Sequence, residues 1–193
     1  MTTEKRVLVV CGDGSEDIEL ASITDTLRRA KANVTLATVN ATLRTTLARG
    51  LKIEADALLE DVKDEQYDAI ALPGGMPGAK HLAASATLER MLKAHANQGK
   101  IVAAVCASPA VVLQAHGIIG DRHAVAYPAF VDKLAHPVKE ARVVVDGTLI
   151  TSAGPGTSIE FALAIVGALF GAPLASEIAS QMLVQTENSV KRF

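Results

Sequence analysis

The sequence predicts an α/β protein in which a mainly parallel sheet is covered by helices on both faces. Short apolar runs typical of buried strands alternate along the chain with amphipathic stretches of helical length. Hydrophobic residues make up 49% of the chain but aromatic residues only 3%, so aliphatic side chains must fill the core. Repeated strand and helix units favour a parallel sheet, because right-handed crossovers place each connecting helix on one face or the other.

The first half of the chain contains strands at residues 6–11, 33–39 and 69–72, with short strands expected at 49–54 and 58–59. The turn Gly12-Asp13-Gly14 ends the first strand. Asp13 is expected to cap the following helix, with Glu16 three positions later, and this helix extends to about Ala30. A Pro-Gly-rich run at residues 73–78 ends the third buried strand, and a helix is expected at 88–98.

In the second half, a buried strand at 101–105 ends at Cys106 and a helix is expected at 109–116. Weaker strands are expected at 123–126, 142–145 and 149–152. A Gly-Pro-Gly turn at 154–156 precedes a strong helix at 158–170, for which Thr157 is the expected cap and Glu160 completes a capping box. The run at 171–173 ends that helix, and a last helix is expected at 174–184.

Size, charge and residue usage narrow the class of protein. A chain of 193 residues without an internal repeat or linker suits one domain spanning residues 1–193. Its net charge of −2 with dispersed Lys and Arg predicts no specific nucleic-acid binding. No apolar run approaches the roughly 18 residues of a membrane span, so we expect no membrane partner and a soluble, cytoplasmic protein.

Metal and cofactor sites are not expected. The two cysteines, Cys11 and Cys106, are too far apart for a CxxC motif and too few for a disulfide scaffold. The five histidines, at positions 81, 95, 116, 123 and 136, show neither an HExxH motif nor paired spacing. We therefore assign no metal ion and no cofactor.

Cys106 is the most informative candidate for a functional residue. It stands where a buried strand stops and a helix with Pro109 in its first turn begins. A sulfur at such a corner points out of the carboxyl edge of the sheet toward the positive end of the helix, and both conditions favour a reactive thiolate. The alternative is that Cys106 is a small core residue.

Glu19 is a candidate partner for Cys106. Helical spacing places it on one stripe with Ile23, Leu27 and Ala30, which is the stripe expected to face the core. Burial of Glu19 would raise its pKa and leave the carboxyl protonated near neutrality, able to donate a hydrogen bond to sulfur and to move a proton. The alternative is a solvated carboxylate that interacts favourably with the helix dipole.

Two glycine-containing segments accompany these residues at the same edge of the sheet. Gly74 and Gly75 follow a buried strand, where their backbone N–H groups could form an oxyanion hole; the alternative is an ordinary tight turn. The segment from Gly154 to Thr157 could line the pocket but is explained as a turn and a helix cap, so we assign it mainly to structure.

Four segments, in order over nearly the whole chain, form a specific pattern. They are residues 14–19 (GSEDIE), 72–75 (LPGG), 103–107 (AAVCA) and 154–166 (GPGTSIEFALAIV). Together these segments resemble the ThiJ/PfpI superfamily and, within it, the parkinsonism-associated protein deglycase (DJ-1) subfamily. The resemblance implies a flavodoxin-like three-layer sandwich and a homodimer.

The resemblance also implies roles for single residues. It implies that Cys106 is the nucleophile and a redox-sensitive thiol, that Glu19 is its protonated partner, and that Gly75 and Ala107 provide backbone donors. Arg49, by itself an exposed strand residue, matches an arginine that family members direct toward the partner subunit's site.

Two positions depart from the relatives. Ala107 stands where the protease-like branch has a histidine directly after the cysteine, so a Cys-His peptidase would lack its base. Tyr127 stands where animal members of the subfamily have a histidine before Pro128. It can hydrogen-bond in the pocket, but it is no base near neutral pH, so Glu19 must move protons alone.

The resemblance implies an enzyme that converts methylglyoxal and glyoxal, or their adducts on protein or nucleotide, without glutathione. Cys106 would attack the aldehyde, with Gly75 and Ala107 holding the oxyanion and Glu19 moving a proton. The alternative is a non-catalytic sensor of oxidative stress or a redox-regulated chaperone, in which Cys106 is oxidised beside a protonated Glu19.

Overall fold

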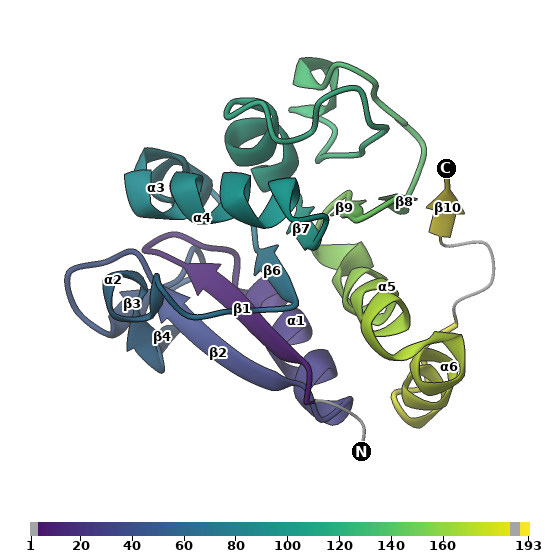
Figure 1. Ribbon diagram of the computed structural model, residues 1–193, viewed down its shortest axis with the longest axis horizontal. Helices are drawn as coiled ribbons and strands as arrows, with labels where there is room; N and C mark the ends of the chain where they lie inside the picture. Colours follow the sequence, from purple (N-terminus) through teal and green to yellow (C-terminus); the bar gives the residue numbers. More distant parts are fainter. Residues whose placement is uncertain (1–3, 186–189) are drawn as a thin grey trace.

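An eight-stranded sheet forms the centre of the computed structural model, which describes residues 4–185 and 190–193 (Figure 1). The strands lie in the order β10-β8-β9-β7-β6-β1-β2-β5. Their bounds are β1 (Arg6–Cys11), β2 (Asn33–Thr38), β5 (Ala57–Leu58), β6 (Ala69–Leu72), β7 (Ile101–Val105), β8 (Val143–Asp146), β9 (Leu149–Ser152) and β10 (Val190–Arg192). Neighbouring strands are parallel except β8 and β9, which are antiparallel. The predicted mainly parallel sheet is therefore confirmed.

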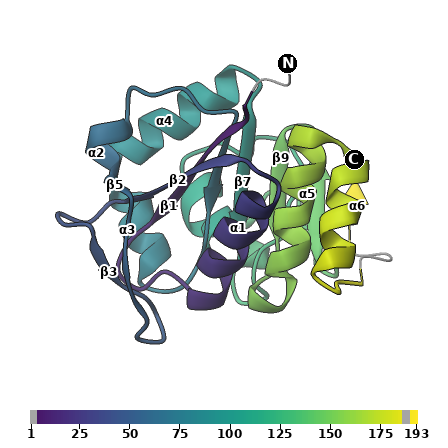
Figure 2. The same ribbon diagram turned by 90° about the horizontal axis from the view of Figure 1, so that it is seen from below.

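Helices cover both faces of this sheet and complete a flavodoxin-like three-layer sandwich (Figure 2). One core lies beneath α1 (Asp17–Arg29), α5 (Ser158–Phe170) and α6 (Ala172–Gln181). The opposite core lies beneath α2 (Leu59–Val62), α3 (Gly78–Ala84), α4 (Ala86–Asn97) and a short π-helical segment, Pro109–Gln114.

The side chains of β1 show why its sequence is apolar throughout. Val7 and Val9 belong to the core under α1 and α5, whereas Leu8 and Val10 belong to the core on the other face. Successive side chains of a strand point to opposite faces, so a strand covered on both sides needs apolar residues at every position. The same reason explains the unbroken apolar runs of β6 and β7.

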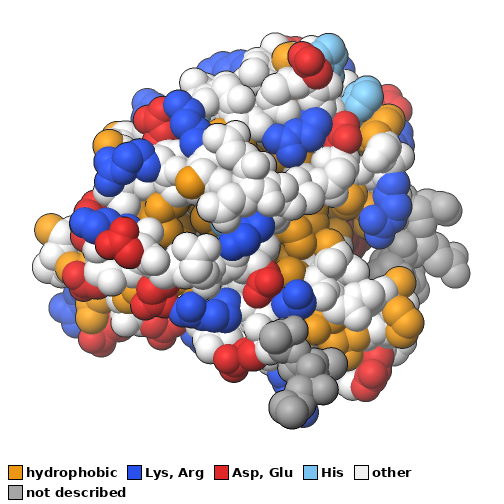
Figure 3. All heavy atoms as spheres, in the orientation of Figure 1, with side chains coloured by type: hydrophobic (Ala, Val, Ile, Leu, Met, Phe, Trp, Pro, Cys, Tyr) orange, Lys and Arg blue, Asp and Glu red, His pale blue; other side chains and the backbone are white. Residues whose placement is uncertain are grey.

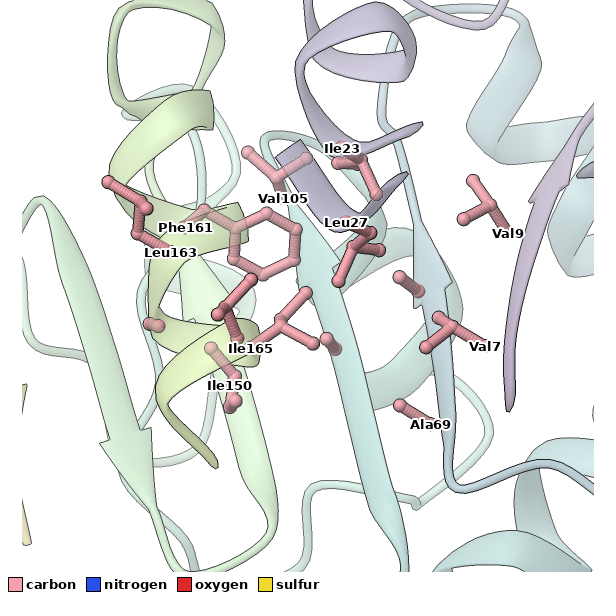
Figure 4. Packing of buried hydrophobic residues seen from close by; sticks show 14 of the residues in the cluster. Val7, Val9, Ile23, Leu27, Ala69, Val105, Ile150, Phe161, Leu163 and Ile165 are labelled. Carbon is pink, nitrogen blue, oxygen red and sulfur yellow. The ribbon is translucent and has the colours of Figure 1, made fainter. Parts of the chain in front are cut away.

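The helices α1 and α5 meet above the central strands. Phe161 and Ile165 of α5 point toward Ile23 and Leu27 of α1 and lie over Val105 of β7 (Figure 4). All five side chains are completely buried. This packing fixes α1, and with it Glu19, relative to the strand that precedes Cys106.

A two-stranded hairpin lies outside the main sheet, formed by β3 (Arg44–Thr46) and β4 (Lys52–Glu54). The strand expected at residues 49–54 begins only at Lys52, because residues 47–51 form the hairpin turn. The short strand expected at 58–59 is found as β5, but Leu59 already begins α2. The first strand of the hairpin was not predicted.

Of the two expected helix caps, Asp13 is wrong, whereas Thr157 occupies the N-cap position of α5 without forming the expected side-chain bond. Asp13 does not cap α1; its carboxylate accepts hydrogen bonds from the N–H of Thr46 and the amide of Asn40 in the neighbouring hairpin region. The cap of α1 is Glu16, whose carboxylate accepts the N–H of Glu19 at 2.8 Å. Asp13 stands three residues before the N-cap Glu16, and its carboxylate instead binds donors of the hairpin region.

The start of α5 shows a similar difference. The hydroxyl of Thr157 bonds to Gly154 and Ser152 inside the preceding turn and not to the first N–H groups of α5. Glu160, the expected second member of a capping box, forms a bidentate pair with the guanidinium of Arg142. This pair attaches the helix to the start of β8.

Other boundaries differ as well. No strand forms at residues 123–126, where Ala124 makes an isolated bridge to Pro137 and the N–H of Val125 binds the hydroxyl of Thr151. The helix expected at 109–116 is the six-residue segment Pro109–Gln114, and the last helix, α6, begins at Ala172 and ends at Gln181. Residues 78–84 (α3) and 190–192 (β10) were not predicted to be regular elements.

Charged side chains of both signs are intermixed on the face shown in Figure 3. No helix in the described ranges is long and apolar enough to cross a membrane. The Lys and Arg side chains on that face do not form one continuous basic surface, as their dispersal in the sequence predicts.

The contact between α1 and α5 provides a test of the fold. Replacement Phe161→Ala removes a ring that is 0% exposed, so we expect the free energy of unfolding to fall by about 3–5 kcal/mol. Phe193→Ala removes a ring that is 57% exposed and should cost less than about 1 kcal/mol. Urea denaturation measures both values, and equal losses would contradict the packing described here.

Candidate active site

Three loops at the carboxyl edge of the sheet bring the predicted site residues together. β6 lies between β1 and β7 in the sheet. Glu19 is on the helix that follows β1, Gly74 and Gly75 follow β6, and Cys106 follows β7. Because the three strands are parallel neighbours, their following segments meet at one place, where ligands of open α/β sheets bind.

Cys106 occupies a sharply bent backbone position. Its φ of 65° lies in the left-handed region, which is unusual for a residue other than glycine and costs free energy. Its N–H donates to the carbonyl of Ser152 at 2.9 Å, and its carbonyl accepts the N–H of Tyr127 at 2.8 Å. Hydrogen bonds to two other segments therefore hold the cysteine in a conformation that it would not adopt in isolation.

The glycines after β6 are required by close approach of two backbones. A Cβ atom at Gly74 would lie 2.7 Å from the Cβ of Cys106 and 2.8 Å from the nitrogen of Ala107. Gly75 has a φ of 85°, and a Cβ atom there would lie 2.5 Å from the nitrogen of Glu16. The tight turn and the close approach inferred from the sequence thus occur together, and no side chain fits between this loop and Cys106.

Glu19 is completely buried beside Cys106. Its Oε2 accepts a hydrogen bond from the N–H of Gly74 at 2.6 Å, whereas Oε1 has no hydrogen-bond partner among the described residues. Burial raises the pKa of this carboxyl to about 7; the Gly74 N–H and the Cys106 thiol lower it in part, and the Glu16 carboxylate raises it further. Since Oε2 accepts from an N–H, the proton of neutral Glu19 resides on Oε1.

The thiol of Cys106 does not have the lowered pKa that its corner position suggested. Burial, and second the nearby carboxylate of Glu19, raise its pKa to about 12, while the N–H groups of Gly75 and Ala107 lower it. The side chain is only 8% exposed, and the helix that follows it is too short to supply a large dipole. The expected thiolate is therefore not favoured while Glu19 carries a charge.

Glu19 and Cys106 titrate as one pair because each charge acts on the other group. Loss of the first proton near pH 7 leaves a single negative charge, carried mainly by the carboxylate of Glu19. Loss of the second proton would place two negative charges in one buried site, which burial and repulsion both oppose. Above about pH 7 the site consequently holds one proton, which lies mainly on the sulfur because the thiol has the higher pKa.

The N–H groups of Gly75 and Ala107 are both close enough to the sulfur to lower its pKa. They come from the two loops that meet at Cys106 and are fixed by the backbone. Donors held in this way can stabilise negative charge that develops next to the sulfur. This is the arrangement that an oxyanion hole requires.

Tyr127 lies beside the cysteine turn, and 44% of its surface is exposed. A Cβ atom at Gly154 would lie 3.2 Å from Cδ2 of Tyr127, so the ring packs on the backbone of the turn at 154–156. The role that we assigned to Tyr127 at the pocket stays a prediction.

Arg49 is exposed in the turn of the hairpin, where its backbone N–H donates to the carboxylate of Asp17. The structure records no hydrogen bond or ion pair from its guanidinium to another described residue. The fold therefore does not tie this side chain to Cys106 of the same chain, and its predicted role at a partner subunit's site is still untested.

Two site residues were not identified from the sequence. The carbonyl of Ser152 accepts the N–H of Cys106, and a backbone contact of this kind leaves no signal in the sequence. The hydroxyl of Ser108 donates to the carbonyl of Pro73. In the sequence, the only indication that Ser108 belongs to the site was its position two residues after Cys106. Within the described ranges, no group of three or more potential metal ligands gathers at one point.

The fold and the site define a flavodoxin-like α/β sandwich with a cysteine and a buried carboxyl at the carboxyl edge of its parallel sheet. The chain matches the DJ-1/PfpI family model over residues 5–168 and belongs to this family. The solved structure of oxidized DJ-1 from Toxoplasma gondii has a TM-score of 0.91 and is 49% identical, covering 93% of this chain and 98% of that one.

Curated relatives agree with this assignment. Protein DJ-1 homolog B of Arabidopsis thaliana is 45% identical over 180 residues, which are 93% of this chain but 41% of the plant protein. The chain thus spans less than half of that relative's length. Glutathione-independent glyoxalase DJR-1.2 of Caenorhabditis elegans is 36% identical over 175 residues, covering 89% of this chain and 92% of the nematode protein.

The raised pKa of Glu19 predicts a pH-dependent stability. The folded value of about 7 exceeds the ordinary value of 4.5, so the folded state binds this proton more tightly than the unfolded state. Stability is therefore full below pH 4.5 and declines as the pH rises to about 7, by about 3 kcal/mol.

Urea denaturation of the wild type and of Glu19→Gln checks this expectation when it is repeated at intervals of about one pH unit between pH 5 and pH 8. Glutamine still accepts the Gly74 N–H but does not ionise, so the wild type should lose stability relative to the variant as the pH rises. The exposed Glu54→Gln serves as control and should show a constant difference. A constant difference for Glu19→Gln too would show that its pKa is not raised.

Proposed function

We propose that the chain is a glutathione-independent glyoxalase and deglycase that acts on methylglyoxal, glyoxal or their adducts through Cys106. The observation that carries this proposal is the buried carboxyl of Glu19, with a pKa raised to about 7 and an unpartnered Oε1 beside the thiol. The name of the nematode relative supports the same reaction class. The proposal includes a single domain over residues 1–193, a cytoplasmic homodimer, no cofactor, and Arg49 and Tyr127 as further pocket residues.

The first step uses the single proton shared by the pair. The thiol of Cys106 gives its proton to the carboxylate of Glu19 as sulfur bonds to the aldehyde carbon. The carbonyl oxygen becomes an oxyanion, which accepts hydrogen bonds from the N–H groups of Gly75 and Ala107. Glu19 then returns the proton to this oxygen, and the product is a hemithioacetal with an ionised Glu19.

The second step moves a proton between neighbouring carbon atoms. The carboxylate of Glu19 takes the proton from the carbon bound to sulfur and delivers it to the adjacent carbonyl carbon. The hydroxyl on the carbon bound to sulfur gives its proton to the neighbouring oxygen, so the first carbon becomes the carbonyl of a thioester and the second carries the hydroxyl of a 2-hydroxy acid. Water then cleaves the bond between sulfur and carbon and restores the thiol of Cys106. Methylglyoxal and water yield lactate, and no external oxidant or reductant is consumed.

An adduct can enter the same sequence when Cys106 attacks the carbon that carries the amine. The amine leaves as sulfur bonds to that carbon, and the hemithioacetal stage is reached without free dicarbonyl. Glu19 is placed to protonate the leaving nitrogen, since its proton lies on the oxygen that has no other partner. Free dicarbonyls and adducts therefore share one intermediate.

A redox sensor, or a chaperone regulated by oxidation, is the second candidate function. The supporting observation is that the sulfur of Cys106 faces a carboxyl that can hold a proton and two backbone N–H groups. Oxidation to a sulfinate would place oxygen atoms among these three donors, which stabilise that state against further oxidation. The sensor needs Glu19 only as a donor, whereas the enzyme needs it to gain and lose a proton.

Methylglyoxal conversion tests the enzymatic proposal. We expect Cys106→Ser and Glu19→Gln each to lower kcat by at least about 100-fold, because each removes a group that takes part in the chemical step. Cys11→Ser is the matched control, since Cys11 is also buried but lies outside the site, and it should keep its activity.

The lactate should be a single enantiomer in the wild type, because Glu19 delivers the proton to one face of the carbonyl carbon. Lactate formed at the same rate by Cys106→Ser would eliminate the proposed nucleophile. Racemic lactate would indicate proton delivery by solvent and remove Glu19 from the second step.

Oxidation by hydrogen peroxide separates the two candidates. In Glu19→Gln, the amide still donates a hydrogen bond but cannot cycle a proton, so selective sulfinate formation at Cys106 should continue while dicarbonyl conversion is lost. Peptide mass spectrometry of the Cys106 and Cys11 peptides provides the measurement. Full conversion in this variant would count against the enzymatic role of Glu19, and loss of selective oxidation would count against its role as a simple donor.

A further inference from the structure

The side chain of Ser108 makes a hydrogen bond that the reaction scheme does not use. Ser108 is 0% exposed, and its hydroxyl donates to the carbonyl oxygen of Pro73 at 2.5 Å. Among the described residues, this is the one hydrogen bond recorded to that carbonyl. Pro73 is itself buried, so its carbonyl oxygen depends on the serine for a partner.

The bond joins the two loops that surround the sulfur. Pro73 directly precedes Gly74, whose N–H binds Glu19, and Gly75, whose N–H is directed toward the sulfur. Ser108 follows Cys106 by two residues on the other loop. The bond therefore connects the groups that act on the sulfur to the turn that carries it.

Three neighbouring N–H positions do not take the place of this hydroxyl, and the N–H of Ala107 is one of them because it faces the sulfur. Pro109 has no N–H group, and the N–H of Cys106 is already donated to the carbonyl of Ser152. The contact between the two loops at Gly74 is a steric one, since it is defined by the absence of room for a Cβ atom. Steric contact limits how closely the loops approach but does not hold them together.

We propose that Ser108 is a positioning residue that holds the loop of Gly74 and Gly75 against the turn of Cys106 and so sets the distances within the Cys106 and Glu19 pair. The proposal concerns the same pair on which the proposed function rests. It makes a separate claim, because the pair has a titration and a thiol reactivity whether or not the protein converts dicarbonyls.

The N–H donors of Gly74 and Gly75 determine in which direction the loss of the serine hydroxyl changes the pKa values of Glu19 and Cys106. Without the serine hydroxyl, the loop relaxes away from the turn, so Gly74 binds Glu19 less well and Gly75 contributes less at the sulfur. Both N–H groups lower the pKa of the group that they face, and weaker contacts raise both values. Glu16 is the other charged group that acts on this pair; it caps α1, and its N–H donates to the carbonyl of Gly74 at 3.0 Å, a bond that the substitution of Ser108 leaves in place.

Alkylation of Cys106 by iodoacetamide as a function of pH measures this effect without a substrate. In Ser108→Ala we expect the midpoint of the pH profile to rise by about half a pH unit or more, which lowers the rate near pH 7 about threefold. Ser108→Thr keeps the hydroxyl and should restore the wild-type midpoint. Peptide mapping distinguishes Cys106 from Cys11.

Thr151→Val is the matched control. Thr151 is also 0% exposed, and its hydroxyl oxygen accepts the N–H of Val125 at 3.0 Å, so this variant loses a buried hydrogen bond elsewhere in the sheet. It should lose thermal stability to a similar degree as Ser108→Ala but keep the wild-type alkylation midpoint. The comparison separates positioning of the pair from general destabilisation.

An unchanged midpoint in folded Ser108→Ala overturns the proposal, as does an equal shift in Thr151→Val. If Ser108→Ala does not fold, Ser108→Cys decides, because its S–H is a weaker donor and should give a smaller upward shift. Fragmentation of the peptide in the mass spectrometer separates alkylation at Cys106 from alkylation at position 108, and a wild-type midpoint for Cys106 there also overturns the proposal. Loss of dicarbonyl conversion in the wild type would leave these outcomes intact, since alkylation requires no turnover. The two proposals therefore fail separately.

Discussion

The hydrogen bond from the N–H of Gly74 to Oε2 of Glu19 is the interaction on which the site depends. It spans 2.6 Å in a completely buried environment and joins helix α1 to the loop after β6. It fixes one carboxyl oxygen as an acceptor and leaves the other, Oε1, to hold the proton beside the sulfur. Because burial raises the pKa of this carboxyl to about 7, Glu19 changes its charge near neutral pH, next to a thiol that keeps its proton.

The strained backbone conformation of Cys106 contributes to the site only because two glycines lie opposite it. Gly74 has no room for a side chain next to the cysteine, and Gly75 adopts a left-handed conformation that brings its N–H to the sulfur. The free energy that these unusual conformations cost is offset by the packing of the two cores on either side of the sheet. Helices α1 and α5 therefore support the site although most of their side chains do not touch it.

The sequence predicted those elements whose pattern is local. The strands β1, β6, β7 and β9 and the helix α5 agree with their predicted bounds. β6 and β7 are continuous apolar segments and β1 is nearly so, whereas β9 and α5 are each followed by a glycine-containing turn. The hydrogen bonds of the expected cap residues were predicted wrongly. Asp13 could have capped its helix, but tertiary folding brought donors of the hairpin region within its reach. Thr157 does stand at the N-cap position of α5, but its hydroxyl bonds within the preceding turn, and both bonding choices depend on backbone geometry that the sequence pattern does not specify.

The sequence by itself determined the fold class, the family resemblance and the candidate pair of Cys106 and Glu19, because strand patterning and motif spacing are properties of the chain. Tertiary structure decided the protonation of that pair. The sequence suggested a thiolate stabilised by a helix, whereas the folded protein buries the thiol beside a carboxyl and raises the pKa of both groups. Desolvation depends on how closely remote segments pack, and the partners of Glu19 and Cys106 come from loops that only the folded sheet brings together.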